Sequence, residues 1–322
     1  MSIDSMSAAA PSVTEEVKQN EDALNCFLPM GITSENVASE HGITREEQDR
    51  IAVMSHQRAA AAKEKFRQEI LPITTTVTDE KTGLIFFFFF SNNLFIVINF
   101  FSFVCKIRVG KKGGGGGEGA NTSSIFFLKN PVFKKTGSTT AGNSSQVSDG
   151  ASAVLLMKRS LANKLGLKIL GKFTHYAVSG VDPALMGIGP AYAIPKVVEM
   201  AGLTLNDIDL FEINEAFASQ CAYCVKKLGL SWDKVNVNGG AIAFGHPLGM
   251  TGTRMTVTLL KELERIGAKR GVKFFFFKYI PFLIPMTLFD QLLFKEGGKK
   301  LNKISIRTEH SFFLSLVFVH FQ

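Results

Sequence analysis

The stretch VNVNGGAIAFGHPLGMTGTRMTVTLLKELERIG, residues 235–267, carries the pattern that decides the fold. Its first four residues alternate between apolar and polar and predict a strand, and a glycine-rich loop follows. Residues 247–267 then predict a long helix that begins near Pro247 and ends at Gly267. The order strand, loop, helix is the building unit of α/β proteins.

The same order recurs upstream of this stretch. From residue 151 the pattern predicts strands over 151–157, 167–178 and 208–213, and helices over 158–166, 190–202 and 215–229. Near the amino terminus, residues 31–70 predict two helices, the second capped by Thr44 with Glu47 three residues later. We therefore expect an α/β fold with helices layered on a sheet.

Composition limits the classes of function. The chain has 322 residues, 46% of them hydrophobic, which is enough for a substantial core. The net charge of +8 would suit nucleic acid, a membrane surface or an anionic small molecule. Because the basic residues are spread along the chain rather than clustered, no nucleic-acid partner is expected.

The four cysteines do not form the framework of a small disulfide-rich protein. Cys221 and Cys224 make a CxxC pair, but no second pair or histidine pair accompanies them, as a zinc site would require. At this spacing on a helix they share one face and are expected to pack inside. No metal is expected.

Two segments differ in character from the rest. Of the 29 phenylalanines, 22 fall within residues 84–128 and 273–322, so the bias is local. The first segment passes from a phenylalanine run to a lysine–glycine run without helical or strand periodicity, a pattern typical of translated non-coding sequence. A membrane span over 84–105 is the alternative interpretation, and four polar residues within it, Asn92, Asn93, Asn99 and Ser102, weigh against it.

His246 and Asn214 are the candidate catalytic residues. Each follows a predicted strand and precedes a predicted helix, and such loops meet at the carboxyl edge of an α/β sheet, so the two are expected to face one crevice. The amino end of a helix disfavours a charged imidazole, and a neutral imidazole can act as a base. The carboxamide of Asn214 can donate to an oxyanion. Each residue could instead serve only as a helix cap.

Four motifs in order resemble the thiolase family, specifically its peroxisomal 3-ketoacyl-CoA members of plant type. They are AGNSSQVSDGASAVLLM at 141–157, MGIGP at 186–190, NEAFA at 214–218 and NVNGGAIAFGHPLGMTG at 236–252. The segment CFLPMGITSENVA at 26–38 is similar to the loop domain of that family. The resemblance implies a layered α/β/α sandwich with a mixed sheet, with the carboxyl-terminal half best preserved.

The resemblance also implies roles. His246 would remove a thiol proton, and Asn214 would help to stabilise the thioester oxygen. Ser145 and Met186 would line the channel for the pantetheine of CoA, Phe217 would border the acyl pocket, and Gly245 would let the ligand approach the backbone. Acyl-CoA and CoA would be substrates, with no separate cofactor, and the chain would form a homodimer in peroxisomes, although no targeting signal is visible.

The departures from the family pattern concern its two catalytic cysteines. Residues 2–7 resemble a segment that follows the nucleophilic cysteine in the family, so the strand and helix that carry it are expected to be missing. The motif of the second cysteine is absent, and Phe276 stands near its expected place. Without a thiol to activate, His246 would lose most of its catalytic effect. An inactive chain that at most binds CoA is therefore the alternative function.

These observations predict five segments. Residues 1–83 would be a remnant of the amino-terminal half, 84–128 an insert foreign to the family, and 129–158 the last strand region of that half. Residues 159–272 would form the carboxyl-terminal thiolase domain, and 273–322 an apolar tail.

Overall fold

The structure, a computed structural model, describes residues 14–71, 75–78, 85–88, 130–146, 148, 150–274, 286–290 and 318–321. Its main sheet has the strand order β3-β8-β4-β7-β6-β5. These strands are β3 (Leu155–Lys158), β4 (Gly171–Ala177), β5 (Leu210–Ile213), β6 (Arg270–Phe274), β7 (Met286–Asp290) and β8 (Phe318–Phe321). Two further strands, β1 (Thr75–Thr78) and β2 (Ile85–Phe88), pair with each other in a separate antiparallel sheet.

The main sheet is mixed, as expected. β5 and β6 run parallel, β7 lies antiparallel between β6 and β4, and β8 lies parallel between β4 and β3. The predicted boundary after residue 272 falls inside β6, whose last residue, Phe274, pairs with Ile213. The sheet therefore continues beyond the segment that the sequence assigned to the regular domain.

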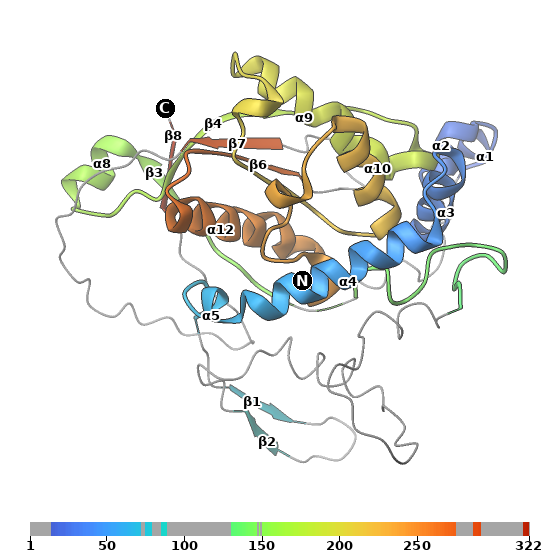
Figure 1. The fold of residues 1–322 in the computed structure, drawn as a ribbon, viewed down its shortest axis with the longest axis horizontal. Helices are drawn as coiled ribbons and strands as arrows, with labels where there is room; N and C mark the ends of the chain where they lie inside the picture. Colours follow the sequence, from blue (N-terminus) through green and yellow to red (C-terminus); the bar gives the residue numbers. More distant parts are fainter. Residues whose placement is uncertain are drawn as a thin grey trace.

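Helices cover the sheet on both faces (Figure 1). The longer helices are α3 (Met30–Glu40), α4 (Arg45–Ala61), α9 (Gly189–Met200), α10 (Ala218–Leu228) and α12 (Leu248–Ile266). Shorter helices are α1 (Glu15–Lys18), α2 (Glu21–Asn25), α5 (Lys63–Phe66), α8 (Arg159–Lys164) and α11 (Ala241–Phe244), with 3-10 turns η1 (Pro183–Ile188), η2 (Leu205–Asp207) and η3 (Trp232–Lys234). Because α9 and α12 lie on opposite sides of the strands, the arrangement is an α/β/α sandwich.

Two apolar clusters fill the sandwich. Beside α9, Ile194 and Val197 pack with Phe211 of β5. Beside α12, Leu259 and Leu260 pack with Leu210, the neighbour of Phe211 on the same strand. Since successive strand residues point to opposite faces, β5 is buried on both sides, including Glu212, which pairs with Arg254.

The helices of the amino-terminal part pack against the site-bearing part. Thr44 caps α4 by accepting a hydrogen bond from the backbone N–H of Glu47 at 3.2 Å, as the sequence predicts. Ile51 and Ala52 of this helix join Ile242 in a third buried cluster. Helix α4 thereby supports α11, the short helix that precedes His246.

Three local predictions were wrong. The segment VNVN is not a strand: Val235 makes a single bridge to Phe211, and Asn236 turns the chain with φ +47°. The strand expected over 151–157 begins only at Leu155, as β3, and residues 151–154 are not in a strand. The helix expected from residue 215 begins at Ala218, so Asn214 does not cap it.

The membrane interpretation of 84–105 falls mostly on residues that the structure does not describe, apart from β2. Among the described residues, no helix combines the length and apolar character that crossing a membrane needs.

Candidate active site

His246 and Asn214 are in direct contact, as the placement of their loops predicts. The Nδ2 atom of Asn214 lies 3.2 Å from the Nε2 atom of His246. His246 sits between α11 and α12, and its backbone N–H donates to the carbonyl of Gln146 at 3.1 Å. Asn214 follows β5 directly and is 1% exposed. The end of one strand and the start of one helix thus bring the two side chains together.

The other ring nitrogen of His246 is also engaged. Its Nδ1 atom lies 2.6 Å from Oγ1 of Thr251, in the first turn of α12. That hydroxyl donates to the carbonyl of Pro247 at 3.0 Å. Both nitrogens of the imidazole therefore have a fixed neighbour. In the sequence, nothing distinguishes Thr251 from an ordinary helical threonine.

The imidazole is held neutral. Burial, and to a smaller extent the positive charge of Arg254, lower the pKa of His246 to about 4. A neutral ring has a lone pair that can accept a proton, as the predicted role of a base requires.

A buried acidic and basic framework surrounds this pair. Glu215, expected as a first-turn helix residue, is instead 2% exposed and accepts hydrogen bonds from Ser55 at 2.6 Å and Asn236 at 2.9 Å. Burial raises the pKa of Glu212 to about 8, although Arg254 lies 3.3 Å away and favours its ionised form. These residues fix the backbone on both sides of Asn214.

The backbone and surroundings of Gly245 do not accommodate a residue with a side chain. Its φ is +94°, a conformation that side chains rarely adopt, and a Cβ placed there would lie 2.2 Å from Oγ of Ser148. The predicted reason was close ligand approach. The reason visible in the structure is close contact with the segment that contains Ser145 and Ser148.

Ser145 lies beside the Asn214 loop through its backbone. Its N–H donates to the carbonyl of Ala216 at 2.9 Å, and Ser144 forms a bridge with Phe217. The 141–157 motif and the 214–218 motif, distant in sequence, are thus adjacent in space.

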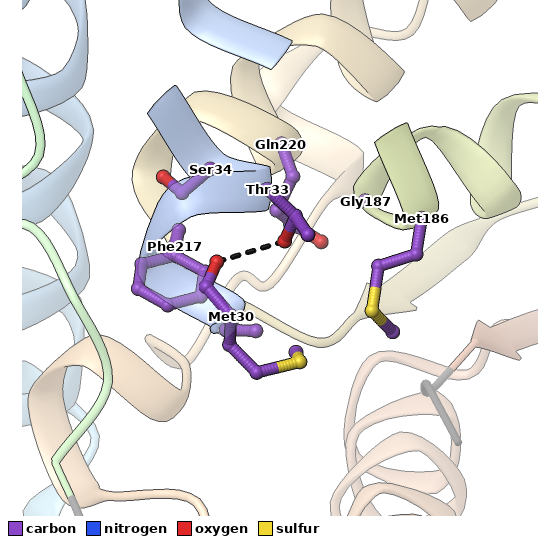
Figure 2. Close-up of a pocket in the computed structure, with 8 residues that line it drawn as sticks. Met30, Thr33, Ser34, Met186, Gly187, Phe217 and Gln220 are labelled. Atoms are coloured by element: carbon purple, nitrogen blue, oxygen red, sulfur yellow. Dashed lines mark hydrogen bonds between the residues drawn. The ribbon is translucent and has the colours of Figure 1, made fainter. Parts of the chain in front are cut away.

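A pocket opens next to this loop. It contains about 230 Å³ of empty space, part of it open to solvent, and is lined by Met30, Thr33, Ser34, Met186, Gly187, Ala216, Phe217 and Gln220. Figure 2 shows Phe217 on the α3 side and Met186 on the opposite side. Two residues predicted for the channel and acyl pocket, Met186 and Phe217, therefore line one cavity. Those from α3 were not predicted individually.

The described cysteines lie away from the pair. Cys221 and Cys224 are buried in α10, and burial raises the pKa of both thiols, which opposes formation of a thiolate. Cys26 contacts the carbonyl of Asp22 at 3.3 Å. Cys105 lies outside the described residues. Within the part of the chain that the structure describes, no three His, Cys, Asp or Glu side chains are grouped so that they could hold a metal ion.

Family comparisons agree with the geometry. The thiolase N-terminal domain model matches residues 1–87 and 122–160, and the thiolase C-terminal domain model matches residues 167–275. The chain belongs to the thiolase family.

Within the thiolase family, the chain is similar to individual peroxisomal 3-ketoacyl-CoA thiolases. The chain is 52% identical over 260 residues to 3-ketoacyl-CoA thiolase B, peroxisomal, of Rattus norvegicus, covering 80% of this chain and 56% of the relative. It is 54% identical over 258 residues to 3-ketoacyl-CoA thiolase 2, peroxisomal, of Arabidopsis thaliana, covering 80% and 51%. The chain thus spans about half the length of these curated relatives.

A solved structure shares the fold. The dimeric peroxisomal thiolase of Saccharomyces cerevisiae matches with a TM-score of 0.64 and 38% identity, over 86% of this chain and 63% of that one. The expected thiolase fold is therefore confirmed.

Proposed function

We propose that the chain acts as an acyltransferase on 3-ketoacyl-CoA, cleaving it with CoA to acetyl-CoA and a shortened acyl-CoA in fatty-acid β-oxidation. One observation carries this proposal: a neutral imidazole and a carboxamide lie 3.2 Å apart, and the loop that carries Asn214 also supplies Ala216 and Phe217 to the pocket. A base and a hydrogen-bond donor at one point are what acyl transfer between thiols needs.

The residues divide the chemistry as follows. The lone pair on Nε2 of His246 takes the proton from a thiol, and the resulting thiolate forms a bond with the keto carbon. An N–H of Asn214 donates to the oxygen of that carbon as negative charge builds on it. The bond between the keto carbon and the neighbouring carbon then breaks, and its electron pair takes up the proton to give acetyl-CoA. The acyl half stays bonded to the attacking sulfur, which makes it the shortened acyl-CoA when the thiol is that of CoA.

The substrates and partners follow from the relatives. The names of the rat and Arabidopsis proteins specify 3-ketoacyl-CoA and peroxisomes, and the yeast protein is described as dimeric. We extend these to the chain: acyl-CoA and CoA as ligands, a second copy as partner, and a peroxisomal location. Met186 and Phe217 would contact the pantetheine and the acyl chain in the pocket.

Binding without turnover is the second candidate. The observation that favours it is that, among the described residues, none of the three cysteines lies in contact with His246 or Asn214. A site that retains its base and oxyanion donor but has no thiol of its own would hold a thioester and leave it intact.

A thiolysis assay separates the two candidates. Full-length chain is incubated with acetoacetyl-CoA and CoA, and the formation of acetyl-CoA is measured alongside calorimetric binding. Turnover that falls about 10²- to 10⁴-fold in His246→Ala, and is unchanged in His175→Ala on β4, supports the acyltransferase. Saturable binding with no acetyl-CoA supports the second candidate. If the chain shows no binding and no turnover, both candidates are contradicted.

A further inference from the structure

Thr251 is in contact with the candidate base, on the side opposite Asn214. Its Oγ1 atom lies 2.6 Å from Nδ1 of His246, and Thr251 is 1% exposed. The same oxygen donates to the carbonyl of Pro247 at 3.0 Å. A threonine in the first helical turn commonly makes this bond to the carbonyl four residues earlier.

The single proton of this hydroxyl decides the protonation of the ring. Because it is directed to Pro247, Oγ1 can only accept from Nδ1, which must then carry the hydrogen of the neutral imidazole. Nε2 is left with its lone pair, facing the N–H of Asn214 at 3.2 Å. In this arrangement every contact has one donor and one acceptor.

Removing the hydroxyl would reverse the arrangement. A buried Nδ1–H without an acceptor is unfavourable, so the ring would carry its hydrogen on Nε2 instead. That hydrogen would meet the N–H of Asn214. The carboxamide would turn to present Oδ1, which is buried and has no hydrogen-bond partner among the described residues. The base would lose its lone pair at the site, and the oxyanion donor would turn away.

We infer that Thr251 is a positioning residue: its hydroxyl selects the ring tautomer of His246 that leaves Nε2 free, and thereby keeps the N–H of Asn214 directed at the same point. This inference rests on the proposed function for its catalytic meaning. The tautomer itself can be measured without any substrate, so it stands or falls independently of the thiolysis assay.

The helix offers a matched control. Thr256 lies five residues further along α12, is 4% exposed, and donates to the carbonyl of Gly252 at 3.0 Å. Thr256→Val loses the same kind of hydroxyl–carbonyl bond without touching an imidazole. Thr251→Val should fold, because the carbonyl of Pro247 still accepts the backbone N–H groups of Met250 at 2.8 Å and residue 251 at 3.0 Å.

The experiment is ¹⁵N NMR of the histidine rings in the full-length chain, at a pH where His246 is neutral. We expect wild type, Thr251→Ser and Thr256→Val to show hydrogen on Nδ1 and a free Nε2. Thr251→Val should show the hydrogen moved to Nε2. A wild type with hydrogen on Nε2, or a Thr251→Val spectrum like that of wild type, would overturn the inference.

Discussion

Asn214→Asp is the most informative change, because it places a negative charge at the atom nearest the candidate base. The replaced atom lies 3.2 Å from Nε2 of His246. A carboxylate within a few ångström favours the protonated ring, so we expect the pKa of His246 to rise from about 4 to roughly 5–7. The positive charge of Arg254, which opposes protonation, places the result toward the lower part of that range.

The pKa is measured by following the Cε1–H signal of each of the six histidines against pH. His246→Gln identifies which signal belongs to the site. Asn206→Asp, at an exposed position in η2, is the matched control and should leave the signal of His246 unchanged. Equal pKa values for His246 in the two aspartate variants would refute the contact between the two loops.

Three other changes test the surroundings of the pair. The pKa of His246 is about 4 in the folded chain and 6.5 for a free imidazole, so between these pH values the unfolded chain binds more protons. As the pH falls from 6.5 to 4, wild type should therefore lose about 3 kcal/mol of stability relative to His246→Gln, measured by urea unfolding. Gly245→Ala should cost about 1–3 kcal/mol of stability by the same method, whereas Gly249→Ala, with open space around it, should be neutral or stabilising. Met186→Trp should weaken calorimetric binding of acetoacetyl-CoA about tenfold or more, and Met200→Trp, on the exposed end of α9, should not.

Strand and helix order could be predicted where the local signals agree. The segment before Asn214, β5, is a strand because both its faces are covered, and the glycines at 229 and 267 end their helices in the left-handed conformation that glycine favours. Thr44 caps α4 because its side chain needs only a neighbour three residues away. These features depend on short stretches of chain.

The strand prediction for residues 235–238 was wrong because a side chain makes the hydrogen bonds that the backbone of a strand would make. Residues 235–238 alternate like a strand, yet the carboxamide of Asn236 accepts from the N–H of Ile213 at 2.8 Å and donates to its carbonyl at 2.7 Å. This side chain satisfies the edge of β5 without a strand. Asparagine favours helix caps, but the contact of Asn214 with His246 depends on the position of a second loop, which local residue preferences do not predict.

The contact between His246 and Asn214 was predictable for a different reason. Asn214 follows β5, and residues 235–238, although not a strand, lie beside β5 through the bridge between Val235 and Phe211, so the two loops start close together. Thr251 was not predictable, because its role depends on the direction of one hydroxyl hydrogen. The pocket residues of α3 likewise depend on how that helix packs beside η1 and α10.

The most direct test of the account is a titration of the full-length chain with acetoacetyl-CoA, monitored through the ring signals of His246. We expect these signals to move and to saturate with the bound fraction, while those of His41, stacked on Tyr223, stay in place. Saturable binding that leaves the signals of His246 where they were would contradict the claim that this imidazole and Asn214 receive the thioester.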